Sequence, residues 1–243
     1  MNAVLITGAA KRLGAAMALH LSAKGYAVAI HYNSSKHDAE ALAGKINASG
    51  GKATLVQGDL CDRESLGSIV PRTVEALGMP LTCLINNASR FEFDRIEDGG
   101  FDSFDRNLKT NLEAPFFLTQ AFAEQCAYEG QVINMIDQRV LRLTPNFASY
   151  TLAKSALYTL TKTAAMSLAP KIRVNAIGPG TTLQGEGQSD ENFAHHRNIS
   201  ILERGADVED ILAAVDYLLV AKNVTGQMIA VDGGQHLIWE LPK

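Results

Sequence analysis

Cysteine is scarce in this sequence, and its few thiols stand far apart. The 243 residues include three cysteines, Cys61, Cys83 and Cys126, and no Cys-x-x-Cys pair. Their odd number and wide spacing argue against a disulfide framework and against a zinc site built on cysteine. We therefore expect buried thiols in a reducing compartment, the cytoplasm.

Long apolar runs and an excess of basic residues are missing as well. No apolar run reaches the length of about 20 residues that a membrane-spanning helix requires. The first strand pattern starts at Ala3, which leaves no room for a signal peptide. The 22 basic and 26 acidic residues give a formal net charge of −4, which disfavours a general nucleic-acid surface. We expect neither a membrane nor a nucleic acid as a partner.

The hydrophobic residues, 47% of the chain, fall into short runs that alternate with helical patterns. Such alternation predicts a parallel sheet, and a chain of this length can form one large α/β domain. We expect a single domain over residues 1–243. The predicted strands are 3–7, 27–32, 53–57, 81–85, 131–136, 172–177 and 227–231.

A glycine turn follows the first of these strands. Gly8 and Gly14 stand six apart between the strand and a helix that ends near Lys24. A strand, a glycine turn and a helix form the dinucleotide fingerprint, in which backbone N–H groups and the helix N-terminus receive a pyrophosphate. The central glycine of the usual motif is missing, but the position after the first strand favours this interpretation.

The end of the second strand lacks the acidic residue that would hold the ribose 2′-hydroxyl of NAD. The segment 31–36 reads His-Tyr-Asn-Ser-Ser-Lys, and Arg12 lies in the glycine turn. Hydroxyl groups and cations suit a 2′-phosphate, so we expect NADPH. The alternative is a solvated polar turn with a serine N-cap.

Tyr150 and Lys154 stand four apart in a helical pattern over about 150–168 and therefore lie on one helix face. A phenol has a pKa near ~10, and a neighbouring ammonium lowers that pKa toward neutrality. A tyrosine tuned in this way can act as a general acid or base. The alternative is a surface pair, because the spacing is common on helices. Asp137 follows strand 131–136 at the same expected edge of the sheet.

Three other segments contain polar or aromatic candidates. Phe91 lies just beyond strand 81–85, either at a ligand or in the core. A long helix is predicted from about residue 101 to 128; within it Pro115 should bend the axis, and Asn111 fills the resulting defect or faces solvent. Residues 181–203 are polar, lack a pattern and are expected to form a substrate loop or lid. Their His195-His196 pair has no second ligand group at a recognisable spacing, so no metal site is predicted.

Together these residues resemble the short-chain dehydrogenase/reductase family over essentially the whole chain. The resemblance implies a single-domain, doubly wound Rossmann fold with seven parallel strands and helices on both faces. It implies that Tyr150 transfers a proton, that Lys154 holds the nicotinamide ribose and tunes Tyr150, and that Asn111 anchors a water in a proton relay. The matching motifs are Thr7-Gly8 to Gly14, Asp59, Asn86-Asn87-Ala88, Asn111, Tyr150 with Lys154, Pro179-Gly180, Thr225-Gly226 and Asp232-Gly233-Gly234.

Three departures from the family pattern resemble the pteridine reductases and the bacterial dihydromonapterin reductases. Arg12 and Ser89 replace glycines, and Asp137 stands thirteen residues before Tyr150, where most members carry serine. The resemblance implies that Ser89, Phe91, Asp137 and Tyr150 contact a pterin, with Phe91 stacking on it opposite the nicotinamide. The cofactor residues it implies are Gly8, Lys11, Arg12, Leu13, Gly14, His31, Ser34, Ser35, Asp59, Leu60, Asn87, Ala88, Ser89, Tyr150, Lys154, Pro179 and Gly180.

The expected activity is NADPH-dependent reduction of a dihydropterin, such as dihydromonapterin, dihydrobiopterin or dihydrofolate. One alternative is a carbonyl or 3-oxoacyl reductase, although an ionised Asp137 can only accept hydrogen bonds and would not stabilise an oxyanion. Another is a protein that binds NADPH without turning it over. Family members are often homotetramers built on the helices before and after strand 131–136. Four alanines serve either that contact or the core: Ala153, Ala156, Ala164 and Ala165.

Overall fold

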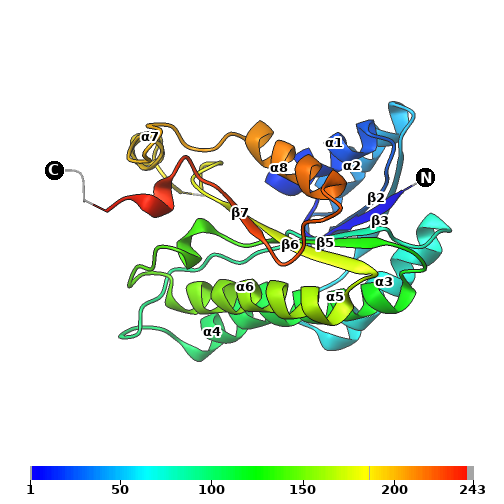
Figure 1. Cartoon of the computed structure of the whole chain (residues 1–243), viewed down its shortest axis with the longest axis horizontal. Helices are drawn as coiled ribbons and strands as arrows, with labels where there is room; N and C mark the ends of the chain where they lie inside the picture. Colours follow the sequence, from blue (N-terminus) through cyan, green and yellow to red (C-terminus); the bar gives the residue numbers. More distant parts are fainter. Residues whose placement is uncertain (1, 186, 240–243) are drawn as a thin grey trace.

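A parallel sheet of seven strands forms the centre of the computed structural model, which describes residues 2–185 and 187–239 (Figure 1). The strand order β3-β2-β1-β4-β5-β6-β7 reverses direction between β1 and β4, which is the point where open α/β sheets bind ligands. Every residue of β1, β2, β4 and β5 is buried, as expected for strands covered on both faces. All seven predicted strands are confirmed: β1 (Ala3–Ile6), β2 (Ala27–Tyr32), β3 (Lys52–Gln57), β4 (Cys83–Asn86), β5 (Gly130–Met135), β6 (Ile172–Pro179) and β7 (Met228–Val231).

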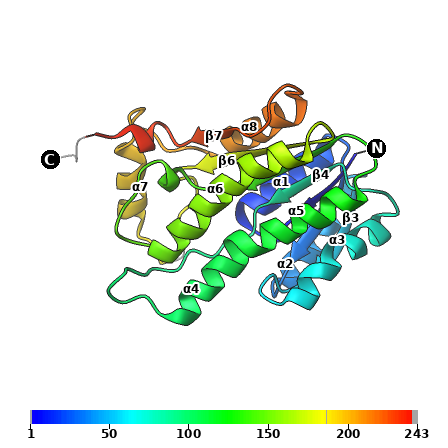
Figure 2. The same cartoon turned by 60° about the horizontal axis from the view of Figure 1, so that its bottom comes forward.

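Helices cover both faces of the sheet, so the predicted doubly wound arrangement is confirmed (Figures 1 and 2). One face is covered by α1 (Arg12–Ala23), α2 (Lys36–Ala48) and α8 (Val208–Val220), which bury side chains such as Met17, Ile46 and Ile211. The other face is covered by α3 (Arg63–Leu77), α5 (Ala114–Gln125) and α6 (Ala148–Leu168), which bury Leu66 and Phe122 among others. α4 (Phe101–Leu108) extends this second layer.

The long helix expected over 101–128 is interrupted. α4 ends at Leu108, a π-helix occupies Lys109–Glu113, and α5 begins at Ala114. Pro115 has no N–H to donate to the carbonyl of Asn111 four residues earlier. The backbone adapts with a wider turn, in which Ala114 N–H donates to the carbonyl of Lys109, five residues back. The predicted defect at Pro115 is therefore present, but as a π-helix.

The segment 181–203 is not loop throughout, because it contains α7 (Asp190–Asn198). The side chain of Ser189 caps this helix by accepting a hydrogen bond from Asn192 N–H at 3.2 Å. No described residue of α7 is buried, so no apolar periodicity was present to predict the helix. Residue 186 of this segment, and residues 1 and 240–243 of the predicted domain, lie outside the described residues.

The helices and the cysteines can be compared with two further expectations, on membrane spans and on buried thiols. Within the described ranges, no helix is long and apolar enough to cross a membrane. Cys83 and Cys126 are buried as predicted, whereas Cys61 is only partly buried. Cys61 belongs to the loop after β3 and lies outside the core. Its Sγ is 3.3 Å from Oγ1 of Thr110.

Candidate active site

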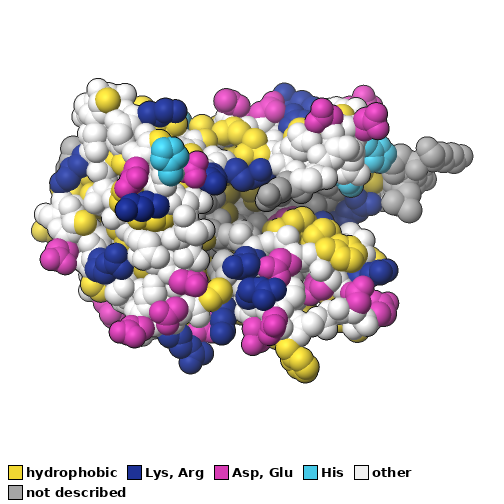
Figure 3. Space-filling model, turned by 180° about the vertical axis from the view of Figure 1, so that it is seen from behind, with side chains coloured by type: hydrophobic (Ala, Val, Ile, Leu, Met, Phe, Trp, Pro, Cys, Tyr) yellow, Lys and Arg dark blue, Asp and Glu magenta, His cyan; other side chains and the backbone are white. Residues whose placement is uncertain are grey.

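The carboxyl ends of β1, β4, β5 and β6 bring distant segments of the chain to one edge of the sheet, the edge beyond which α7 lies (Figure 1). They place Gly8, Asn87, Asp137 and Gly180 along this edge. Seen from behind, the surface is hollowed on this half of the molecule, with hydrophobic and basic side chains at the margins (Figure 3). The first turn of α6 brings Tyr150 to the same edge.

Tyr150 and Asp137 form a direct pair. The Tyr150 hydroxyl donates a hydrogen bond of 2.8 Å to Oδ2 of Asp137, while Oδ1 accepts one from Arg139 N–H at 2.8 Å. Burial raises the pKa of Tyr150 well above its ordinary value, and the Asp137 carboxylate raises it further. The pKa of Tyr150 therefore does not approach neutrality in the protein alone, contrary to the prediction made from Lys154, because burial and Asp137 dominate.

Lys154 is buried beneath Tyr150. Its Nζ donates to the carbonyl of Met135 at 2.8 Å and lies 5.7 Å from the centroid of the Tyr150 ring. Burial lowers the pKa of Lys154 to about 8, although Asp137 opposes this shift. An ammonium has three N–H donors, so two remain to hold a ligand beside Tyr150. The surface-pair alternative is wrong, because Tyr150 is 5% exposed and Lys154 is 2% exposed.

An aromatic cluster lies next to the pair. The Phe91 ring stacks on Phe147, with centroids 4.0 Å apart, and lies nearly perpendicular to the Tyr150 ring, with centroids 4.7 Å apart. Phe91 is 54% exposed, so the alternative of a core aromatic is wrong. The Arg139 guanidinium lies 5.1 Å from the Phe147 centroid and 5.8 Å from that of Phe91. Sequence reasoning missed Phe147 altogether, and only the closeness of Arg139 to Asp137 in sequence could have suggested Arg139.

Asn111 is fully buried and holds the loop after β4, so it does not face solvent. Its Oδ1 accepts hydrogen bonds from Ser89 Oγ at 2.8 Å and from Arg90 N–H at 3.2 Å. Its Nδ2 donates to the carbonyl of Arg90 at 3.0 Å and to Oδ1 of Asn107 at 3.2 Å. Because the side chain is fully used, a water in a proton relay would have to bind the Asn111 carbonyl, which Pro115 leaves without its usual donor.

The glycine turn after β1 is shaped by its neighbours. A Cβ on Gly8, whose φ is +60°, would lie 3.0 Å from Cα of Ala88, and a Cβ on Gly14 would collide with the carbonyl of Gly8. Oγ1 of Thr7 accepts hydrogen bonds from the N–H groups of Asn87 and Ala88, both at 2.9 Å. α1 begins beside this turn and has no side-chain cap. Its first N–H groups are therefore free to bind an anion.

The structure corrects the expected role of His31. This residue is 2% exposed; its Nδ1 accepts a hydrogen bond from Gly8 N–H at 3.2 Å, and its Nε2 lies 3.2 Å from the carbonyl of Gly58. Burial lowers the pKa of His31 to about 4, so the imidazole is neutral at pH 7. A buried neutral ring supports the Gly8 turn and cannot offer charge to a 2′-phosphate.

The other predicted phosphate ligands lie at the surface. Lys11 Nζ forms an ion pair of 3.0 Å with Asp38. Arg12, with φ +54°, donates to the carbonyls of Gln184 at 2.8 Å and Leu183 at 3.3 Å, and thus contacts the 181–203 segment. Ser34 is exposed, and Ser35 precedes α2 without capping it through its side chain.

The remaining predicted residues border the same edge. Asp59 is exposed and Leu60 is buried just after β3, where the adenine is expected. Leu13 lies in the first turn of α1. Pro179 ends β6, and Gly180 N–H donates to the carbonyl of Val231 at 2.9 Å. A Cβ on Gly180 would lie 2.7 Å from Cα of Asp232, so this close approach requires glycine.

Comparisons with known proteins identify the family and several relatives of this chain. A family described as enoyl-(acyl carrier protein) reductase matches residues 8–236. Pteridine reductase 1 of Leishmania tarentolae is 34% identical, with 96% of each chain covered, and a 3-oxoacyl-[acyl-carrier-protein] reductase FabG of Staphylococcus aureus is 31% identical, covering 97% of this chain and 98% of the relative. The crystal structure of FolM alternative dihydrofolate reductase 1 from Brucella canis, complexed with NADP, is 41% identical and superposes with a TM-score of 0.95 over 99% of this chain and 96% of that one.

Proposed function

The chain belongs to the short-chain dehydrogenase/reductase family of oxidoreductases, and from this premise we propose that it reduces a dihydropterin to the tetrahydro form with NADPH. The observation that carries the proposal is the hydrogen bond from Tyr150 to Asp137. A carboxylate at this place accepts hydrogen bonds and repels a developing oxyanion. It therefore suits a substrate with N–H groups and a C=N bond, as in a dihydropterin.

The residues of the glycine turn fit NADPH. The close packing that requires glycine at positions 8 and 14 holds the turn tight against its neighbours, and the uncapped start of α1 leaves N–H groups that can bind phosphate. When bound there, NADPH supplies the hydride. Arg12 and the hydroxyls of Ser34 and Ser35 are our candidates for its 2′-phosphate, with His31 supporting the turn from beneath. NADP in the Brucella canis relative supports this choice of cofactor.

Tyr150 is our candidate for the proton donor. Its raised pKa keeps the hydroxyl protonated at pH 7, so the group is ready to give a proton to the substrate nitrogen that becomes basic on reduction. Lys154 holds the ribose hydroxyls and offsets part of the negative charge that appears on Tyr150. The carbonyl of Asn111 is the candidate anchor for the water that returns the proton.

Phe91 and Ser89 are our candidates for binding the pterin ring. Phe91 projects from the loop after β4 with half its surface exposed and with its edge neighbour Tyr150 4.7 Å away. A planar heterocycle that stacks on it would have its reactive bond near the Tyr150 hydroxyl. The segment 181–203, which Arg12 contacts, is our candidate substrate loop.

A second candidate function is reduction of a 3-oxoacyl thioester, which the FabG relative favours. Oxidation of NADPH, followed with a dihydropterin and in parallel with an acetoacetyl thioester, separates the two. We expect turnover of the pterin and little or none of the thioester. Turnover of the thioester alone would reject the pterin assignment, and binding of NADPH without any turnover would indicate a sensor.

We also propose a cytoplasmic homotetramer in which α5 and α6 pair across subunits. Apolar side chains are exposed on these helices, including Phe116, Leu152 and Met166. Three of the four alanines, Ala153, Ala164 and Ala165, are buried in the core, so they are not available for such a contact. Analytical ultracentrifugation should give four times the 26.1 kDa mass of one chain, and a monomer would reject this arrangement.

A further inference from the structure

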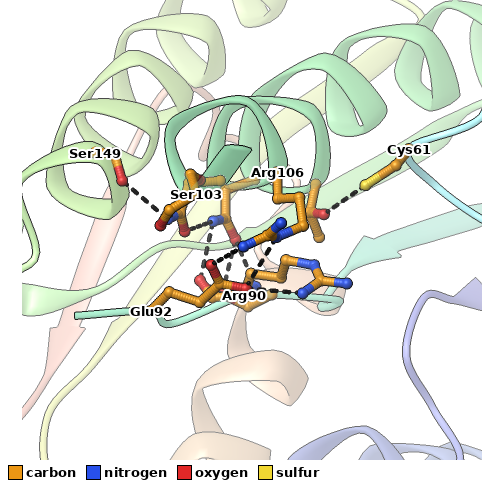
Figure 4. Close-up of polar contacts among 10 residues, drawn as sticks. Cys61, Arg90, Glu92, Ser103, Arg106 and Ser149 are labelled. Carbon is orange, nitrogen blue, oxygen red and sulfur yellow. Dashed lines mark hydrogen bonds and ion pairs between the residues drawn. The ribbon is translucent and has the colours of Figure 1, made fainter. Parts of the chain in front are cut away.

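The segment that follows β4 alternates between two sets of partners. Phe91 and Phe93 meet the Phe147 ring at centroid separations of 4.0 and 5.3 Å. Glu92 instead accepts two hydrogen bonds from the guanidinium of Arg106 in α4, at 3.0 and 3.3 Å (Figure 4). Asp94, again two residues on, is 6% exposed. One side of the segment thus forms the aromatic cluster, and the other side binds it to helices.

Asp94 closes the N-terminus of α6 from outside that helix. Its carboxylate accepts the N–H of Ser149 at 3.2 Å to one oxygen and 3.3 Å to the other. Its backbone carbonyl accepts the N–H groups of Phe147 at 2.8 Å and Ala148 at 3.3 Å. The N-cap residue Phe147 has no side-chain acceptor for these groups. Asp94 therefore satisfies N–H groups of the first turn and places a negative charge at the positive end of the helix.

The contact determines how two functional side chains lie relative to each other. Phe91 stands three residues before Asp94, and Tyr150 lies in the turn of α6 that Asp94 binds. Between them Phe147 is held at φ +60°, a conformation unfavourable for a bulky residue. Asp94 joins the loop that carries Phe91 to the start of α6, which carries Tyr150. The residues that its hydrogen bonds connect are 53 to 55 positions apart in sequence.

We propose that Asp94 is a positioning residue that sets the placement of Phe91 against Tyr150 and thereby the affinity for a planar substrate ring. The inference rests on the proposed function insofar as it assigns that ring to Phe91. Asp94 touches neither the cofactor cradle nor Asp137, so its role is separate from NADPH binding and from proton transfer.

A purely structural role as a helix cap is the competing explanation, and the chain offers a matched control. Asp62 caps α3 by accepting the N–H groups of Glu64 and Ser65, both at 3.3 Å. Asp94→Ala and Asp62→Ala each remove an aspartate cap from one helix. Asp94→Asn keeps an oxygen that can accept from Ser149 and removes the charge.

Steady-state kinetics at saturating NADPH give the first test. Asp94→Ala should raise the KM for the dihydropterin by about tenfold, the value of one aromatic contact, with kcat and the Kd of NADPH nearly unchanged. Asp94→Asn should recover most of the KM, and Asp62→Ala should leave it unaltered. A KM in Asp94→Ala equal to that of the wild type, or an equal rise in both alanine variants, would overturn the positioning role.

A second measurement needs no substrate. In NMR spectra of protein labelled at phenylalanine, the Phe91 signal, assigned with Phe91→Leu, should carry a ring-current shift from Phe147 and Tyr150. Asp94→Ala should abolish this shift, while Asp62→Ala should preserve it. An unchanged shift in Asp94→Ala would reject the proposed role of Asp94 even if the wild type reduces pterins. If the wild type does not turn over pterins but Asp94→Ala still loses the ring-current shift, the pterin substrate is rejected and the positioning role of Asp94 is retained.

Discussion

The hydroxyl of Tyr150 donates its hydrogen bond to Asp137 at 2.8 Å, so the tyrosine that would transfer the proton is paired with a carboxylate. In that pair burial and the negative charge keep the pKa of the phenol high. The same carboxylate raises the pKa of Lys154, which is buried below. Because the Asp137 charge acts on both Tyr150 and Lys154, a pKa from a rate profile should not be assigned to either residue alone.

Replacement of Asp137 tests the substrate class. Asp137→Ala should lower kcat with the dihydropterin by about 10²–10⁴-fold, the usual range for a general acid–base group, while the affinity for NADPH is preserved. Asp137→Ser should also lose pterin turnover, although serine is the common residue of the wider family, because a single hydroxyl cannot replace the carboxylate as the acceptor for N–H groups of a pterin. Unchanged pterin turnover in the serine variant would show that Asp137 is incidental.

The pH dependence of the reaction should follow Lys154 on the alkaline side. Since its pKa in the protein is about 8 and the proton is needed to hold the ribose and to stabilise phenolate, kcat/KM should fall as the pH rises through about 8. The Asp137 charge raises this pKa, so Asp137→Asn should move the fall to lower pH. In Lys154→Arg, whatever activity remains should show this fall of kcat/KM at a higher pH. A profile that is flat to pH 10 would contradict this assignment.

His31 should make the fold sensitive to acid. Its pKa is about 4 in the folded protein and 6.5 in its ordinary state, so the unfolded chain binds more protons in this interval. Stability is therefore lost as the pH falls from about 6.5 to about 4, by on the order of 3 kcal/mol. Urea unfolding across this range measures the loss. His31→Gln keeps an acceptor for Gly8 N–H and should flatten the slope, and an equal slope in both proteins would exclude His31 as its source.

Cofactor choice should depend on Arg12. NADPH should bind more tightly than NADH by about tenfold to a hundredfold, the value of a charged hydrogen bond to phosphate. Arg12→Ala should narrow this gap. Arg12→Gly also removes the guanidinium but relieves the unfavourable φ of +54°, so it should narrow the gap equally while melting at a higher temperature than the alanine variant. Equal Kd values for the two cofactors in the wild type would contradict the 2′-phosphate assignment.

Phe91 should matter for the substrate and little for stability. Phe91→Ala should weaken dihydropterin binding while leaving the Kd of NADPH nearly intact, because the ring is half exposed. Its melting temperature should stay close to that of the wild type. Phe122, which is fully buried, provides the contrast, since Phe122→Ala should cost about 3–5 kcal/mol of stability. A parallel loss of both ligands and of melting temperature in Phe91→Ala would indicate a core role.

Much of the architecture could be predicted from local patterns. The alternation of apolar runs and helical periods determined the parallel sheet, and the position of Gly8 after the first strand indicated the nucleotide turn. The order of Asn87, Tyr150 and Lys154 along the chain identified the family, because strands that end at one edge bring such residues together. The polar helix α7 could not be predicted this way, since it buries none of its described residues.

The sequence by itself determined which chemical groups are present: a tyrosine, a lysine and an aspartate at spacings that place them near one sheet edge. The sequence also predicted that Asp137 lies beside Tyr150. Only the tertiary structure decided that the Tyr150 hydroxyl donates to Asp137, that His31 is buried and neutral beneath the Gly8 turn, and that Asp94 holds the start of α6. The reason is physical. Spacing along a chain specifies which residues share a face, but burial, charge and hydrogen-bond partners arise from contacts such as that of Asp94 with Ser149, which are 55 residues apart in sequence and adjacent only once the sheet is formed.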